Sequence, residues 1–222
     1  SVPEARILRP GLVTAEEILP PPGITSLTVI SGSLTPVRGV GPDLADMYVF
    51  RINEPMVFSA STREEDGGFT EFDPNLWLFR VVEMEPRQAF GLLGNRDEGA
   101  AGTAASFLGR VANDGTGAAV MNPGVYALAI TGGDHSPVSA GGPIFQFLND
   151  GEVSGPDGPG GGQPQTGFAG PGETGDYVII LSGSAPFGNM HPVPAVSDVG
   201  LALMATILIA AGSMLFRRRT AA

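Results

Sequence analysis

Eighteen consecutive residues close to the C-terminus, 199–216, carry no charge, and only Thr206 and Ser213 among them have polar side chains. As an α-helix rising about 1.5 Å per residue, this run would reach roughly 27 Å, close to the thickness of about 30 Å of a bilayer's hydrocarbon core. The polar stripe that marks a helix packed on the surface of a protein core is missing. The run therefore predicts a single transmembrane helix, and it leaves the preceding residues to form the folded body.

Three arginines, Arg217, Arg218 and Arg219, follow this run directly. Positive charge beside a membrane span tends to stay in the cytoplasm. We therefore expect a basic cytoplasmic tail at 217–222 and residues 1–198 on the outer side of the membrane. The first ten residues, SVPEARILRP, contain neither an initiator Met nor the apolar stretch of a secretory signal. We therefore expect that the body is exported with a signal peptide that this numbering does not include.

The eight residues VPAVSDVG, at 193–200, join the body to the apolar run. A short Pro-containing motif, one apolar span and a terminal arginine cluster together resemble the C-terminal sorting signals of the PEP-CTERM class. The motif lacks the Pro-Glu-Pro core and is closer to the variant that begins Ile-Pro-Thr-Leu-Ser-Glu-Trp-Gly. It departs from that variant at Ala195 and Val199. It matches at Pro194, Ser197 and Gly200, and conservatively at Val193, Val196 and Asp198.

The resemblance implies a partner for the tail, an exosortase-type membrane enzyme that processes such signals near the motif. An ordinary single-pass anchor is the alternative, and it would keep the protein in the membrane. Both fates of the tail are open at this point.

Length and composition restrict the body further. The chain of 222 residues has room for one domain of about 150 residues besides the tail, enough to bury a core without covalent staples. It has no cysteine, so the exported body is not a disulfide scaffold. Its formal net charge of −11 argues against a nucleic-acid partner, which would require a basic surface. The acidity favours solubility outside the cell and is compatible with divalent cations.

Short runs rich in β-branched and aromatic residues, separated by turn residues, dominate the body. Of these runs, 76–82 (LWLFRVV) is almost entirely apolar, which is typical of a central strand with both faces covered. No convincing amphipathic helix interrupts the series. The pattern predicts an all-β fold, a β-sandwich or jelly roll. The predicted strands are 24–34, 46–52, 55–62, 76–82, 106–112, 124–130 and 176–184.

The remaining segments frame this body, which we place at 24–184. Residues 1–23 end in LPPPG and are expected to be extended, with at most a turn at 15–19. Residues 151–175 contain ten glycines and four prolines and too few apolar side chains to order themselves, which predicts a mobile loop between two late strands, with Phe168 as a residue that could pin it to the domain. Residues 185–198 form the linker and the sorting motif.

Five segments of the body resemble, in order and spacing, the bacterial pre-peptidase C-terminal (PPC) domain over about 27–184. The resemblance implies a β-sandwich accessory module of a secreted protein, and some modules of this kind bind calcium. Where the family has an Asn-Asp-Asp run, this chain has NRDE at 95–98. The matching segments are DMY (46–48), FSAST (58–62), LWLF (76–79), PGVYALAI (123–130) and GDYVIIL (175–181).

The sequence offers few candidates for catalysis. His135 lies in GDHSP, whose Asp134 and Ser136 are too close along the chain to form a triad with it, and His191 lies in the linker. Nucleophile-elbow, zinc-protease and phosphate-loop motifs are absent. Acidic pairs that could hydrolyse glycosides do not stand out from the acidic surface. We therefore expect no enzymatic activity and keep a secreted hydrolase, or its accessory module, as the alternative.

A calcium site is the one cofactor site with candidate residues. Ca²⁺ takes several oxygen ligands, typically from loops, and four aspartates lie at the ends of predicted strands. No spacing among them matches an EF-hand loop, so structural or solvated roles are favoured. The four candidates are Asp43, Asp46, Asp97 and Asp114.

Trp77 is the one tryptophan of the chain. With Phe79 it lies on the side of its strand opposite to Leu76 and Leu78. An exposed Trp could stack on a sugar ring, whereas the apolar strand around it favours a place in the core.

Together these features predict an exported, non-enzymatic cell-surface or extracellular-matrix protein. We expect it to be anchored in the inner membrane of a Gram-negative-type bacterium, with its body in the periplasm, and then sorted and released at its tail. A permanently tethered binding module for extracellular polysaccharide or for another protein is the alternative.

Overall fold

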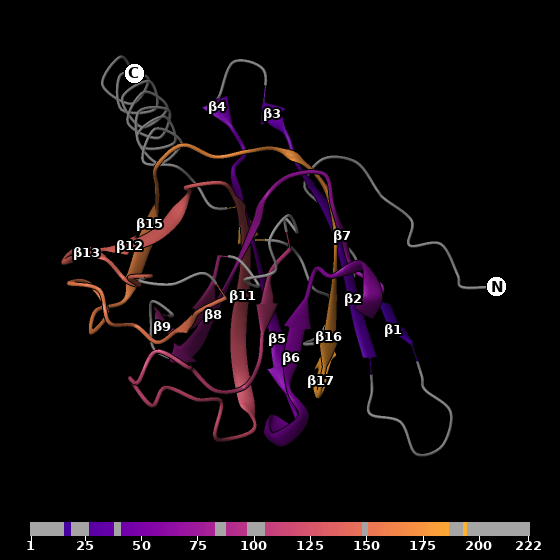
Figure 1. Cartoon of the computed structure of the whole chain (residues 1–222), viewed down its shortest axis with the longest axis horizontal. Coiled ribbons are helices and arrows are strands. Elements are labelled where there is room, and N and C mark those ends of the chain that lie inside the picture. The colour runs from indigo at the N-terminus through magenta and orange to yellow at the C-terminus, as the bar shows by residue number, and fades with distance from the viewer. Residues whose placement is uncertain are drawn as a thin grey trace, which may run out of the picture.

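Antiparallel strands make up nearly all of the regular structure of the described residues in the computed structural model (Figure 1). The structure describes residues 16–18, 27–37, 41–82, 88–96, 105–147, 151–186 and 193–194. Two larger sheets share one core, and a small sheet covers the outer side of one of them. The prediction of an all-β fold is therefore confirmed.

The first sheet is built around β2 (Leu27–Leu34) and β16 (Gly175–Ser182), which pair along eight residues. Successive side chains of a strand point to opposite faces, which places Ile30, Ile179 and Leu181 on the same buried face of the sheet. The order across the sheet is β1 (Glu16–Ile18), β2, β16, β6 (Ser59–Ser61) and β10 (Phe107–Leu108), with β7 (Phe69–Thr70) also paired to β16.

The second sheet has β8 (Pro74–Val82) near its centre, between β9 (Gln88–Asn95) and β11 (Gly124–Gly132). Both faces of β8 are covered, as its apolar run predicts, because successive side chains from Leu76 to Phe79 are all fully buried. The order across the sheet is β14 (Val153–Ser154), β9, β8, β11, β5 (Ala45–Ile52) and β17 (Ser184–Pro186). The short β18 (Val193–Pro194) also pairs with β5.

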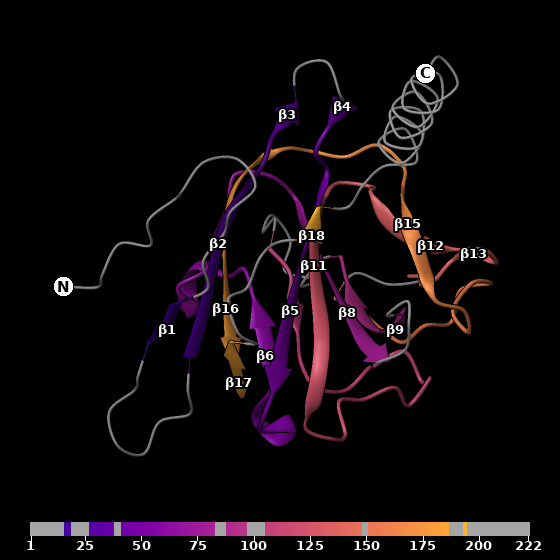
Figure 2. The ribbon, with the colours of Figure 1, turned by 180° about the vertical axis from the view of Figure 1, so that it is seen from behind.

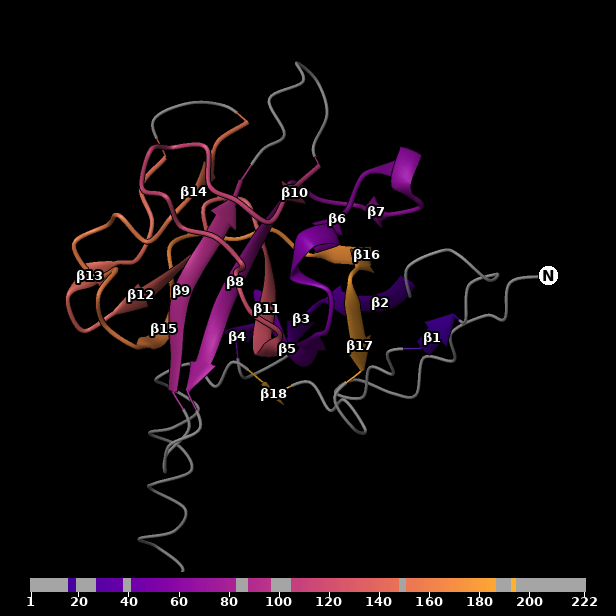
Figure 3. The ribbon, with the colours of Figure 1, turned by 90° about the horizontal axis from the view of Figure 1, so that it is seen from below.

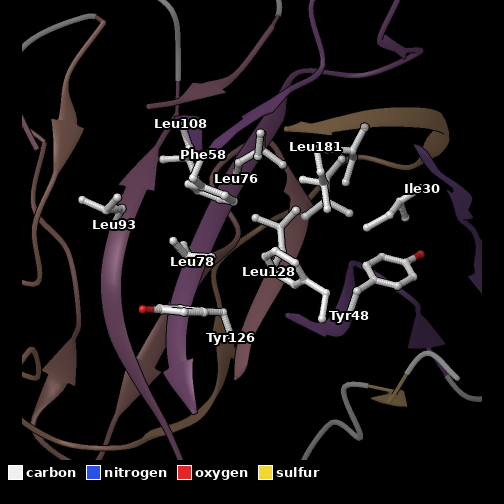
Figure 4. Packing of buried hydrophobic residues seen from close by; sticks show 14 of the residues in the cluster. Ile30, Tyr48, Phe58, Leu76, Leu78, Leu93, Leu108, Tyr126, Leu128 and Leu181 are labelled. Atoms are coloured by element: carbon white, nitrogen blue, oxygen red, sulfur yellow. The ribbon is translucent and has the colours of Figure 1, made fainter. Parts of the chain in front are cut away.

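The main core lies between these two sheets (Figure 4). Leu76 and Leu128 of the second sheet belong to the same buried cluster as Ile30 and Leu181 of the first. Complete burial of such a side chain stabilises the fold by roughly 1.5–3 kcal/mol relative to its exposure. The shared core makes the body sandwich-like.

A second apolar cluster lies on the outer side of the second sheet. Trp77 and Phe79 pack there beneath Phe145, because their side chains alternate with those of Leu76 and Leu78. The cover comes from residues 144–147 and from a third sheet, which flanks β8 and β9 (Figure 3). That sheet has the order β13 (Gly142–Pro143), β12 (Ser136–Ser139) and β15 (Gln165–Ala169).

Short elements connect the sheets. The strands β3 (Pro36–Val37) and β4 (Gly41–Pro42) form a two-stranded ribbon. Two single-turn 3₁₀ helices, η1 (Pro55–Val57) and η2 (Glu64–Asp66), precede β6 and β7. The second of them ends at Gly67, whose φ of 89° lies in the left-handed region that glycine adopts without strain.

Several predicted elements are wrong in detail. The predicted strand at 55–62 begins instead with η1, and only 59–61 forms a strand. The predicted strand at 106–112 shrinks to the two residues of β10. In the segment expected to be extended with at most a turn at 15–19, residues 16–18 form β1 and pair with β2.

The prediction of an unstructured loop at 151–175 is also wrong. Both β14 and β15 lie within this segment. Its glycines make backbone hydrogen bonds to the cover of the second cluster: the amide of Gly158 donates to the carbonyl of Ile144 at 3.0 Å, and that of Gly160 donates to the carbonyl of Pro143 at 2.9 Å. Phe168 packs against the second cluster, as predicted. Contacts with the rest of the body thus supply the order that the segment's own composition does not.

The C-terminal predictions have different outcomes. The predicted body ends at 184, but β17 continues to Pro186, and β18 places part of the predicted linker on the body. The predicted transmembrane helix at 199–216 and basic tail at 217–222 lie outside the described residues. Within the described part of the chain, no helix has the length and apolar character needed to cross a membrane.

Candidate functional site

A buried polar network crosses the main core between the two sheets. It consists of Asp46 and Tyr48 on β5 and Tyr177 on β16, and we call it the Asp46 network. The Tyr177 hydroxyl donates a hydrogen bond to Oδ2 of Asp46 at 2.5 Å, and it shares a second hydrogen bond with the hydroxyl of Tyr48. Asp46 is 8% exposed and both tyrosines are 1% exposed. A carboxyl group therefore lies in an interior of otherwise apolar side chains, held by phenolic donors.

The geometry of the strands brings these groups together. Asp46 and Tyr48 are two residues apart on one strand, so both side chains project to the same face. Tyr177 faces them from the other sheet, and its neighbour across the first sheet is Gly32. A Cβ at Gly32 would lie 2.6 Å from Cζ of Tyr177 and 2.9 Å from the hydroxyl oxygen of Tyr48. The missing side chain of Gly32 makes the space that the two phenols occupy.

Burial dominates the electrostatics of the Asp46 network. The pKa of Asp46 is raised to about 6, mainly by burial and also by the nearby carboxylate of Asp43, whereas the hydrogen bonds from the tyrosines oppose the shift. Burial, and then neighbouring groups of the network, raise the pKa of Tyr48 and of Tyr177 well above the ordinary value. Both phenols therefore stay protonated and serve as donors, whereas Asp46 exchanges a proton near neutral pH.

The edge of β5 beside this network carries the start of the tail. In β18, Val193 is opposite Met47 and Pro194 is opposite Asp46. Of the predicted sorting residues the structure thus places Val193 and Pro194. The others lie outside the described residues: Ser197, Asp198, Gly200, Arg217, Arg218 and Arg219.

The predicted calcium ligands that the structure describes, Asp43, Asp46 and Asp114, do not form one group. Asp43 and Asp46 are close enough to influence each other, but Asp46 already accepts a hydrogen bond from Tyr177. Asp114 lies beside β14, which is four strands from β5, or roughly 19 Å at about 4.8 Å per strand. Asp97 lies outside the described residues. In the part of the chain that the structure describes, no three acidic, histidine or cysteine side chains form a group that could hold a metal ion.

Asp114 instead fastens a turn. Its Oδ1 accepts hydrogen bonds from the amide of Thr116 at 2.9 Å and from the Thr116 hydroxyl at 2.6 Å. Its Oδ2 accepts from the amide of Gly155 at 2.6 Å and from the hydroxyl of Ser154 at 3.3 Å. Burial alone would raise the pKa of Asp114, but these donors outweigh it and lower the pKa. The carboxylate connects the loop before β11 to the glycine-rich segment, and its two oxygens already accept these four hydrogen bonds.

The aromatic and histidine candidates have structural roles. Trp77 is fully buried, which confirms its predicted place in a core, although that core is the second cluster. Its Nε1 donates to Oγ1 of Thr131 at 2.9 Å. His135 stacks on Phe168 and its Nδ1 is 2.8 Å from the carbonyl of Gly170. A Trp in this position cannot stack on a sugar.

The neighbours of His135 in the chain do not join it in a catalytic arrangement. Asp134 accepts a hydrogen bond from Nη2 of Arg96 at 2.6 Å instead. The Asp46 network contains one proton acceptor and two phenolic donors, and all three side chains are buried. Chemically it can hold or release one proton inside the sandwich.

Three members of this site escaped the sequence analysis: Tyr48 and Tyr177 as partners of Asp46, and Gly32 as the residue that makes room for them. The Asp-x-Tyr spacing in DMY indicates that Asp46 and Tyr48 share a face. The pairing with Tyr177 joins residues 131 positions apart, and no local pattern contains that information.

Comparison with family models, with curated proteins and with solved structures gives no match for this chain.

Proposed function

We propose that this chain is an exported, non-enzymatic cell-surface or extracellular-matrix protein that is sorted through its C-terminal tail by an exosortase-type enzyme. The body would be a PPC-like β-sandwich module. The observation that carries the proposal is the three-part tail: the motif at 193–200, the uncharged run at 199–216 and the three arginines that follow it.

The role of the tail in this proposal is positional. The apolar run is long enough to stop transfer in the inner membrane, and the arginines hold its end in the cytoplasm. The motif then stands directly outside the bilayer, between the membrane and the body. A membrane enzyme that cuts near the motif would release the body to the envelope or the matrix.

Features of the body agree with this role. Its all-β, sandwich-like architecture suits an accessory module, and a net charge of −11 favours solubility after release. The candidate histidine and aspartates that are described serve structural hydrogen bonds and packing. These contacts support a non-catalytic role.

The test is the intact mass of the protein recovered from the membranes and from the medium of a host that has the processing enzyme. We expect a released form that ends within 193–200. The matched control replaces Arg217, Arg218 and Arg219 by glutamate, which keeps the length of the tail but removes its positive end, and its released fraction should fall. A full-length species found only in membranes would overturn the proposal.

A permanently tethered binding module is the second candidate. It is favoured by exposed apolar side chains at one end of the second sheet, where Met56 is 71% and Met121 is 68% exposed. Met56 lies on η1, directly after β5, and Met121 lies just before β11; these strands pair there through Ile52 and Gly124. Contiguous exposed apolar patches mark sites where proteins bind partners, and the strand pairing brings these two side chains to the same end of the sheet. The membrane-only outcome of the mass measurement would favour this candidate.

A further inference from the structure

The outer edge of β5 is a strand-binding surface of the body. One edge of β5 pairs with β11 along the whole strand. The other edge pairs with β17 at residues 50–52 and with β18 at residues 46–47 (Figure 2).

The strand β5 is a well-fixed template for such an addition. Its inward side chains, Asp46, Tyr48 and Phe50, are buried in the main core. On its outer face, Met47 and Val49 pack against the second cluster. An added strand therefore meets a backbone that is held from both faces, and main-chain hydrogen bonds can supply its affinity.

The sequence of β18 suits this edge position. Proline has no amide hydrogen to donate, so it is tolerated on an edge strand and not in the middle of a sheet. Pro194 lies at the outermost strand, opposite Asp46, and Val193 is a β-branched residue of the kind that strands favour. The paired residues are the first two of the sorting motif.

We infer that the body holds Val193 and Pro194 on the edge of β5 as an added strand, and so competes with the processing enzyme for the motif. This inference rests on the proposed function. A peptide cannot pair with β5 and lie in the groove of an enzyme at the same time. When opening and closing are fast, cleavage follows the fraction of molecules in which the segment is free. The folded body thereby sets the rate at which its own tail is processed.

A pair of engineered cysteines tests the docking directly, because the chain has no cysteine of its own. Met47 and Val193 are direct partners in an antiparallel pair, where Cα atoms are about 4.5–5.5 Å apart, within the range of a disulfide. In the full-length protein in membranes, Met47→Cys with Val193→Cys should form the disulfide under mild oxidation. The matched control is Val49→Cys with Val193→Cys, whose two positions are diagonal neighbours about 7–8 Å apart. Its disulfide yield should be at least tenfold lower.

Processing is then measured on the first pair in cells that contain the enzyme, by intact mass, with and without a reductant. Both redox forms carry the same two substitutions, so their comparison isolates the docking. We expect release from the oxidised form to be at least tenfold slower than from the reduced form. Equal release from both forms, or equal disulfide yield in the two pairs, would overturn the inference alone. Failure of the unmodified chain to be released would overturn the proposed function itself.

Discussion

At the residue scale, Asp46 sets the most specific chemical property of the body. The pKa of the Asp46 carboxyl is about 6 in the folded protein and about 3.9 in the unfolded chain. At pH values between these two, the folded protein therefore binds more protons at Asp46 than the unfolded chain does. The contribution of Asp46 to the free energy of unfolding is fully present below about pH 4 and is lost as the pH rises through about 6. The body should therefore become less stable from pH 4 to pH 7 through Asp46.

Asp46→Asn should remove this dependence, because the amide keeps the size of the side chain but does not titrate. The free energy of unfolding of the wild type, relative to that of the variant, should fall by about 2 kcal/mol between pH 4 and pH 7. Urea unfolding of both proteins at several pH values measures the difference, in which the contributions of the other carboxyl groups largely cancel. Parallel curves for the two proteins would show that Asp46 does not titrate in this range.

Gly32→Ala should disturb the same network from the other sheet. The added Cβ would lie 2.6 Å from Cζ of Tyr177, and overpacking of this kind costs about 1–3 kcal/mol. Gly167→Ala is the matched control, because a Cβ there meets nothing within 4 Å, and it should change stability by less than about 0.5 kcal/mol. Urea unfolding at one pH compares them, and equal midpoints would contradict a filled space behind Gly32.

Sequence analysis could identify Asp46 as a notable residue but not its role. Its position at the end of a predicted strand made it a candidate cation ligand, although a structural or solvated role was favoured. The structure buries it because Tyr48, two residues later, and Tyr177, 131 residues away, supply donors that an isolated carboxylate would lack. Long-range partners decide whether a charged residue can be buried.

At the element scale, glycine explains why some strands were predicted and others were missed. In β8 an unbroken apolar run predicted a central strand correctly. In β9 the outward positions include Gly91 and Gly94, so the alternation of apolar side chains is absent. A Cβ at Gly94 would lie 2.9 Å from Cε3 of Trp77. These glycines let the cover of the second cluster approach the sheet closely, which a single-sequence pattern does not convey.

Gly94→Ala should therefore displace Trp77. The indole ring or Phe145, which would be 3.3 Å from the new Cβ, has to move, at a cost of about 1–3 kcal/mol. Since the chain has one tryptophan, its fluorescence reports this site alone: we expect a red shift and stronger quenching by acrylamide. Gly162→Ala, with nothing within 4 Å of its Cβ, should leave the spectrum unchanged. An unchanged spectrum for Gly94→Ala would mean that the cover does not press on Trp77.

At the scale of the whole molecule, the crossing from β16 to β17 joins the two sheets. The chain leaves the first sheet at Ser182 and enters the second at Ser184, and Gly183 makes the bend with a φ of 67°. The carbonyl of Gly183 accepts hydrogen bonds from the amides of Asn53 and Glu54, both at 3.0 Å. The predicted end of the body at 184 cuts this closing strand, because its sequence, SAP, has none of the apolar alternation that marks a strand.

A body that ends at Gly183 should accordingly be less stable than one that ends at Pro186. It lacks β17, whose pairing covers residues 50–52 of β5, and the loss of two or three backbone hydrogen bonds at about 1 kcal/mol each gives a decrease of about 2–3 kcal/mol. The uncovered edge of β5 is also a template for pairing with a second molecule. Urea unfolding and light scattering of the two bodies, at matched concentrations, check both effects. Equal midpoints together with equal molecular masses would show that β17 neither stabilises the second sheet nor shields its edge, and the edge would then have little affinity to offer to Val193 and Pro194.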